Sequence, residues 1–136
     1  MRLLLDTHAF VWMLQAPDRL SPRVLKAHDD PDNTLCVSVA SLWELQIKHA
    51  LGKLELDIPL AQIVAEQLQG DRFVLLDIRA PHVLELNALP AHHGDPFDRM
   101  LIAQARTEKL ALVIRDAKIA RYGLTDAGIS LLLPWI

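Results

Sequence analysis

The chain has 136 residues, 51% of them hydrophobic, which suffices for one domain, residues 1–136, with a sizeable core. Its net charge of −3 gives no global support for nucleic-acid binding, so any such binding has to be local. No apolar run approaches the roughly 18 residues of a membrane helix, and residues 3–5 are too short an apolar run for a signal peptide, so we expect a cytoplasmic protein.

Two strands and four helices are predicted in the first half of the chain. In chain order they are a strand over 3–5 that ends on Asp6, helices through 15 and over 22–29, a strand over 34–38, and helices over 39–51 and from 57–59 to 70. Ser38 is suited to cap the helix that follows it. Cys36 is a lone cysteine within an apolar strand, which excludes a disulfide framework and a thiolate metal site.

The second half predicts the same alternation of strand and helix. The elements are a strand over 73–77, a short helix over 80–87, a central helix from Asp95 to about 108, a strand over 110–114, a helical turn over 118–122 and a last strand over 130–133. Alternating elements with continuous apolar strands predict an α/β fold, in which helices cover both faces of a parallel sheet.

Three of these strands end in an aspartate: Asp6, Asp77 and Asp116. Ligands of such sheets bind outside the carboxyl ends of the strands, so acids at these ends are candidates for a site. The alternative is that each aspartate only forms a turn or caps a helix.

Two further acids lie on predicted helices. Asp98 suits the positive end of the helix dipole, but it also shares a face with Ile102 and Ala105 that should point inward, where a charge needs a partner. Glu44 lies on an otherwise apolar helix, four residues before Lys48. The alternative reading of Glu44 is an ordinary surface ion pair with that lysine.

Taken together, Asp6, Glu44, Asp98 and Asp116 indicate a cluster of carboxylates. Oxygen ligands without cysteine, and without metal-binding histidine spacing, favour Mg²⁺ or Mn²⁺. Such ions activate water against phosphodiesters, so the chemistry expected is phosphodiester hydrolysis. Arg99, Arg115 and Lys118 adjoin these acids in sequence and are candidate contacts to an RNA backbone; the alternative is that they are ordinary surface charges.

With these acids placed, the chain resembles the PIN-domain ribonucleases, and among them the VapC-like toxins of type II toxin–antitoxin systems. The matching segments are residues 3–8, 38–44 with Lys48, 93–99 and 112–116, in the order of the family. The resemblance extends over essentially the whole chain.

The resemblance implies a five-stranded parallel sheet in the order 3-2-1-4-5, with the Asp6 strand central. It implies catalysis at a metal held by Asp6, Glu44 and Asp98, with Asp116 as a fourth acid, and with Thr7 and Ser38 as hydroxyls beside these ligands. Asp77 would end an outer strand, away from the cluster. The chain departs from the family in one place: Ile114 stands where a Thr or Ser is frequent, two residues before Asp116.

The function expected is therefore a metal-dependent endoribonuclease. The resemblance also implies a homodimer and a cognate antitoxin whose extended segment covers the acidic site. The alternative from another class is a PIN-like scaffold that binds RNA or a partner without cutting. A phosphatase with an aspartyl nucleophile is a third possibility, but the sequence following Asp6 lacks the second aspartate of that motif.

Overall fold

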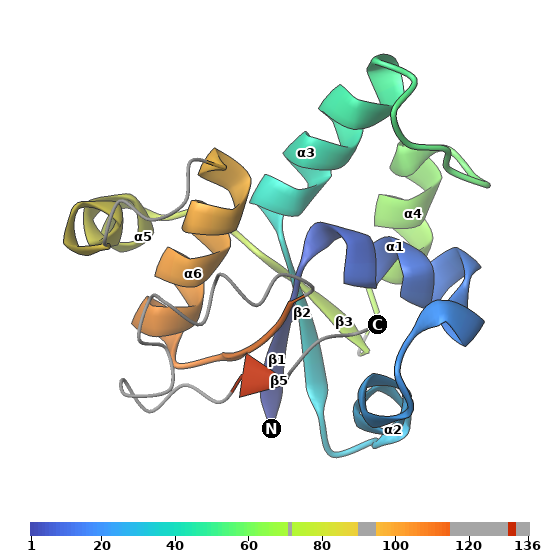
Figure 1. Cartoon of the computed structure of the whole chain (residues 1–136), viewed down its shortest axis with the longest axis horizontal. Helices are drawn as coiled ribbons and strands as arrows, with labels where there is room; N and C mark the ends of the chain where they lie inside the picture. The colour runs from blue at the N-terminus through green and yellow to red at the C-terminus, as the bar shows by residue number, and fades with distance from the viewer. Residues whose placement is uncertain (71, 90–94, 115–130, 133–136) are drawn as a thin grey trace.

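The computed structural model describes residues 1–70, 72–89, 95–114 and 131–132 (Figure 1). Its first half contains β1 (Arg2–Leu5), α1 (Thr7–Gln15), the 3₁₀ turn η1 (Pro17–Arg19), α2 (Pro22–Asp29), β2 (Thr34–Ser38), α3 (Val39–Ala50) and α4 (Leu60–Gln67). β3 (Phe73–Leu76), α5 (Ala80–Glu85), the 3₁₀ turn η2 (Leu86–Ala88), α6 (Pro96–Glu108), β4 (Ala111–Val113) and β5 (Leu131–Leu132) follow.

The strands form a parallel sheet with β1 near its centre. Four of them run in the order β3-β2-β1-β4, and β5 adds a two-residue pairing beside β4. β1 is paired on both sides, with Leu5 opposite Val37 of β2 and opposite Val113 of β4. The predicted α/β class, parallel sheet and central β1 are confirmed.

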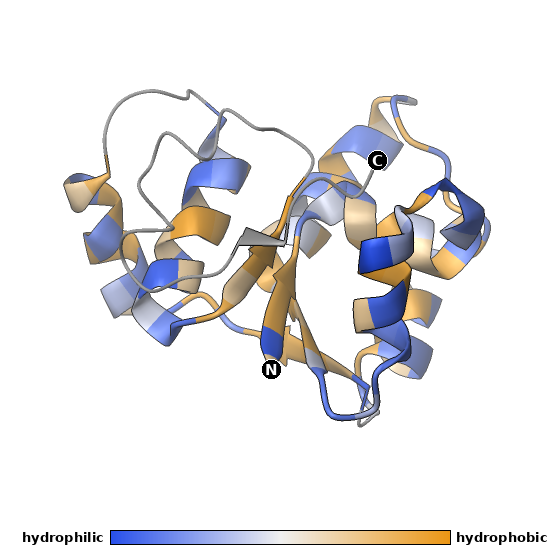
Figure 2. Cartoon of the chain, turned by 60° about the horizontal axis from the view of Figure 1, so that its bottom comes forward, coloured by the Kyte–Doolittle hydropathy of each residue, from blue (hydrophilic) through white to orange (hydrophobic). Residues whose placement is uncertain are grey.

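Side chains of the strands alternate between two hydrophobic cores. Leu3 and Leu5 point into the larger core, which α1, α2, α3 and α4 cover, whereas Leu4 points into the smaller core under α6. All three leucines are fully buried, and Figure 2 shows the hydrophobic strands enclosed by helices. Burial on both faces explains why the strands are continuous apolar runs.

Helix boundaries follow the capping signals of the sequence. Ser21 and Asp95 accept hydrogen bonds from backbone N–H groups at the starts of α2 and α6, each with a proline at the first helical position. The predicted helix over 80–87 is shorter, because α5 ends at Glu85 and η2 follows. The helix expected from 57–59 to 70 is likewise limited to Leu60–Gln67, with Pro59 as its N-cap residue. No helix among the described residues is long and apolar enough to cross a membrane.

Helix α5 is held against α6 by polar contacts. The buried His82 lies with Nε2 2.7 Å from Glu108 Oε1, while its Nδ1 accepts a hydrogen bond from the backbone N–H of Arg79. Arg106 on α6 forms an ion pair with Glu85 at 3.2 Å. These contacts hold α5 against the end of α6.

Candidate active site

The carboxyl ends of β1 and β2 lie side by side and place two helix starts at one edge of the sheet (Figure 1). Because Leu5 is opposite Val37, the residues that follow, Asp6 and Ser38, are neighbours at this edge. Asp6 caps α1 and Ser38 caps α3, so both helices begin where ligands of parallel sheets bind.

Asp6 is held in place through its backbone and its side chain. Its N–H donates to the carbonyl of Val113 at 2.9 Å, which extends the pairing of β1 with β4. Its Oδ1 accepts a hydrogen bond from the N–H of Ala9 at 2.7 Å, and the residue is 9% exposed. The carboxylate is therefore nearly buried, at the positive end of α1.

Glu44 lies one helical turn beyond Ser41 on α3 and is only 3% exposed. The hydroxyl of Thr7, the first residue of α1, donates to Glu44 Oε1 at 2.6 Å, and it lies 3.1 Å from the hydroxyl oxygen of Ser41. The ammonium of Lys48 contacts the other oxygen, Oε2. We call these four residues, Thr7, Ser41, Glu44 and Lys48, the Glu44 cluster.

The start of α6 reaches the same edge through an aromatic contact. Trp43 and Phe97 meet edge to face, with ring centroids 5.2 Å apart. Each ring immediately precedes a candidate acid in sequence, Glu44 on α3 and Asp98 in the first turn of α6. Asp98 is half-buried, and its backbone N–H donates to Oδ1 of Asp95 at 3.1 Å.

Asp95 is a structural residue, as its position before Pro96 predicts. Its Oδ1 accepts from the N–H groups of Phe97 and Asp98, which makes it the N-cap of α6. Asp77 follows the outer strand β3, and its carbonyl accepts a hydrogen bond from Gln104 Nε2 at 3.2 Å. Asp77 thus follows a strand that is not adjacent to β1, as expected of an acid outside the cluster.

The cationic candidates are placed only in part. Arg99 on α6 donates through Nη2 to the carbonyl of Leu86 at 3.2 Å, so part of its guanidinium serves the packing of α6 against η2. Asp116, Arg115 and Lys118 lie outside the described residues.

The donors present suit a hard cation. Asp6 and Glu44 contribute buried carboxylates, and Thr7 and Ser41 contribute hydroxyls, which are the oxygen ligands that Mg²⁺ and Mn²⁺ take. No three His, Cys, Asp or Glu side chains of the described residues are arranged to hold an ion by themselves. The contact of Lys48 with Glu44 shows that a cation is already accommodated at this carboxylate.

Sequence reasoning missed the hydroxyl contact that Ser41 makes with Thr7 and the burial of Glu44. The pair of Glu44 with Lys48 does form, but it is not the surface pair of the alternative reading, because Glu44 is buried. Ser41 precedes Glu44 by three residues, a spacing that places the two side chains on one helical face, but spacing alone does not assign Ser41 a part in the site.

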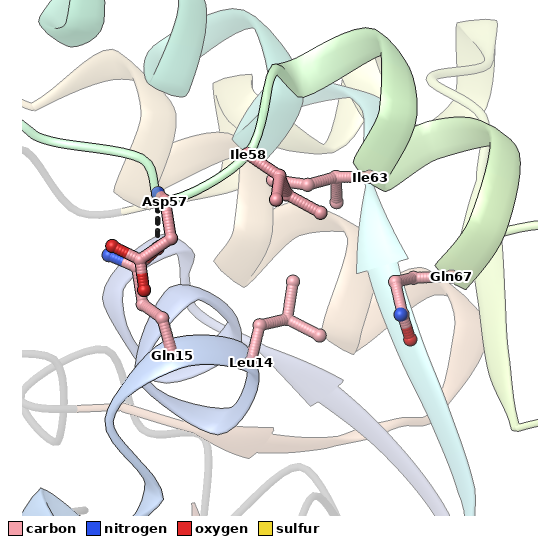
Figure 3. Close-up of a pocket in the computed structure, with 6 residues that line it drawn as sticks. All are labelled: Leu14, Gln15, Asp57, Ile58, Ile63 and Gln67. Atoms are coloured by element: carbon pink, nitrogen blue, oxygen red, sulfur yellow. Dashed lines mark hydrogen bonds between the residues drawn. The ribbon is translucent and has the colours of Figure 1, made fainter.

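A pocket lies at the other end of α1 (Figure 3). It is lined by Leu14, Gln15, Asp57, Ile58, Ile63 and Gln67. The Asp57 N–H donates to Gln15 Oε1 at 3.1 Å, which joins two of the lining residues. Since Asp6 and Thr7 begin α1 while this pocket lies at its last residues, the pocket is separate from the candidate active site.

Comparison with known proteins gives consistent matches. The PIN domain family matches residues 3–124. The chain is 29% identical over 119 residues to Ribonuclease VapC22 of Mycobacterium tuberculosis, covering 86% of this chain and 88% of that protein.

Similar solved structures cover nearly the whole chain. VapBC2 from Rickettsia felis, bound to a DNA fragment from their promoter, has a TM-score of 0.71 at 20% identity and covers 100% of both chains. VapBC-1 from nontypeable Haemophilus influenzae has a TM-score of 0.64 at 22% identity and covers 99% of this chain and 98% of that chain. At these identities, the likeness shows a shared fold.

Proposed function

Because the chain belongs to the PIN-domain family, we propose that it is a metal-dependent endoribonuclease and the toxin of a type II toxin–antitoxin pair, acting in the cytoplasm. The observation that carries this proposal is the meeting of Asp6 and the Glu44 cluster at one edge of the sheet. The 29% identity to a protein named a ribonuclease supports RNA as the substrate.

In this proposal Asp6, Glu44 and Asp98 hold one or two Mg²⁺ or Mn²⁺ ions, with Asp116 as a fourth acid. A bound ion of this kind activates water for attack on a phosphodiester and stabilises the charge that develops. The protein's own part is to orient the acids: the N–H of Ala9 holds Asp6, and the Thr7 hydroxyl holds Glu44. Ser38 fixes the start of α3 by accepting from the N–H of Ala40 at 3.0 Å.

The substrate of the proposed nuclease is single-stranded RNA within a folded molecule. With a net charge of −3, the chain cannot rely on general attraction to phosphates. A loop with splayed bases can bring one phosphate to the acids and its neighbours to side chains around them. Arg99, Arg115 and Lys118 are the proposed contacts to the RNA backbone.

The partner of the proposed toxin is an antitoxin segment that covers the acidic edge. VapBC structures are among the similar solved structures, which supports this kind of partner. An arginine from the segment fits best, since its planar guanidinium matches carboxylate geometry. We also propose that the chain, residues 1–136, is a single domain that forms a homodimer.

The test is RNA cleavage by the purified chain with Mg²⁺ or Mn²⁺. The wild type should cut structured RNA at few sites and leave duplex DNA intact, and Asp6→Asn, Glu44→Gln and Asp98→Asn should each lose cleavage while staying folded. Asp77→Asn is the matched control, as an aspartate that follows a strand outside the cluster, and Asp95→Asn should be mild because asparagine caps a helix as well as aspartate. If the wild type binds RNA without cutting it in either metal, a non-catalytic RNA-binding module replaces this proposal.

A further inference from the structure

Lys48 occupies the carboxylate that the proposed function assigns to a metal ion. Its ammonium contacts Glu44 Oε2 across one turn of α3, while the Thr7 hydroxyl takes Oε1. Both oxygens of a buried acid are thus engaged by the protein itself, one by a neutral donor and one by a full positive charge.

This pair differs in energy from an ordinary pair at the same spacing. An exposed pair four residues apart on a helix stabilises a protein by only a few tenths of a kcal/mol, because water solvates both charges. Glu44 is 3% exposed, so water cannot replace Lys48 as its partner without the carboxylate moving. Lys48 therefore neutralises a charge that would otherwise oppose folding.

Lys48 is nevertheless free to leave, because only one end of its side chain is held. The side chain is 31% exposed, and its flexible four-carbon stem can carry the ammonium into solvent. The backbone of Lys48 can stay in place while the side chain moves. Its carbonyl keeps the hydrogen bond that it accepts from the Lys53 N–H, at 2.9 Å, at the end of α3.

We propose that Lys48 is a resident counter-cation, which neutralises Glu44 in the metal-free protein and leaves Oε2 when a divalent ion binds. This inference rests on the proposed function, since it takes Glu44 as a metal ligand. Lys48 is then a positioning residue with two effects: it keeps the metal-free site folded, and it weakens metal binding because the ion has to displace it.

The test measures the Kd of Mn²⁺ by calorimetry, without RNA, for the wild type, Lys48→Met and Lys53→Met. Without metal, Lys48→Met should melt at a lower temperature than the wild type. It should nevertheless bind Mn²⁺ at least about tenfold more tightly, because the ion no longer has to displace a contact whose free energy is that of a hydrogen bond to a charged group. Lys53→Met removes the same charge from an exposed position just after α3 and should change the Kd by less than about twofold, because exposed charges are screened.

Lys48→Arg keeps the experiment decisive if Lys48→Met does not fold. The guanidinium retains the charge and binds carboxylates through two donors, so this variant should bind Mn²⁺ no more tightly than the wild type. An unchanged or weaker Mn²⁺ affinity of a folded Lys48→Met variant overturns the inference, as does tighter binding by Lys48→Arg or no Mn²⁺ binding by any variant. Mn²⁺ binding without RNA cleavage instead contradicts the nuclease proposal and leaves the exchange of Lys48 for metal standing.

Discussion

Asp6 caps helix α1 and is also a candidate metal ligand. A substitution that tests the ligand role therefore has to keep the cap. Asparagine caps a helix as well as aspartate, whereas alanine loses the hydrogen bond to the Ala9 N–H. Asp6→Asn should lower RNA cleavage at least about 100-fold. Loss of a residue that only supports a metal ligand lowers activity by up to about 100-fold, and loss of the ligand itself should lower it at least as much. Its free energy of unfolding should stay within about 0.5 kcal/mol of the wild type.

Asp6→Ala separates the two uses. It should lose cleavage to the same extent and in addition lower the free energy of unfolding by about 0.5–2 kcal/mol, measured by urea denaturation. Wild-type cleavage by Asp6→Asn would show that Asp6 is only a cap.

Thr7 acts through Glu44, because its hydroxyl donates to Oε1 at 2.6 Å. Thr7→Val keeps the shape and removes the donor, so cleavage should fall about 10–100-fold and the free energy of unfolding by about 1–3 kcal/mol. Thr7→Ser keeps the hydroxyl and should recover most of both losses. Equal cleavage by Thr7→Val and Thr7→Ser would mean that the hydroxyl has no part in placing Glu44.

Helix α6 ends in a conformation that its sequence does not favour. Lys109 has φ 57° and ψ 49°, the left-handed region, and its N–H and that of Leu110 both donate to the carbonyl of Ala105. Glycine is the usual residue there, since a side chain costs about 1–2 kcal/mol. Lys109→Gly should therefore raise the free energy of unfolding by about 1 kcal/mol, measured by thermal or urea denaturation.

Lys109→Asn is the control variant for Lys109→Gly, because asparagine has a side chain but tolerates the left-handed region better than lysine does. It should be intermediate in stability. A destabilised Lys109→Gly variant would indicate that the lysine side chain contributes more than the backbone conformation costs.

For the molecule as a whole, the sheet was the most predictable part. Continuous apolar runs such as Leu3–Leu5 reflect burial on both faces, and the caps Ser21 and Asp95 mark their helices unambiguously. The Glu44 cluster was only half predictable. Helical spacing relates Glu44 to Ser41 and Lys48, but the donor Thr7 comes from another helix, and only the packing of α1 against α3 brings it there.

The lone cysteine gives the whole molecule a pH-dependent stability. Burial raises the pKa of the Cys36 thiol above its ordinary value of 9.0; the charge of Arg2 offsets this in part, and that of Glu108 adds to it. As the pH rises, the thiol ionises first in the unfolded chain, which then binds fewer protons than the folded one. Stability therefore falls between the ordinary pKa and the raised one.

The measurement is urea denaturation under reducing conditions at pH 8 and pH 10. The wild type should lose more stability between these values than Cys36→Ala does, because alanine has no thiol to ionise. The comparison is between the changes in the free energy of unfolding from pH 8 to pH 10 in the two proteins. Lysines and tyrosine titrate in both proteins, so their contribution cancels. The cost of the cavity left by alanine cancels as well, because it is present at both pH values. Equal losses would show that the thiol does not drive this dependence.

The pairing of β1 with β4 has a consequence for a chain still attached to the ribosome. Leu3 pairs with Ala111, and the N–H of Asp6 donates to Val113, so β1 is synthesised long before the strand that completes its surroundings. Contacts this distant in sequence form late and slowly. The nascent chain therefore cannot fix Asp6 in its final place until Val113 has left the ribosome, and the proposed nuclease would stay inactive until then.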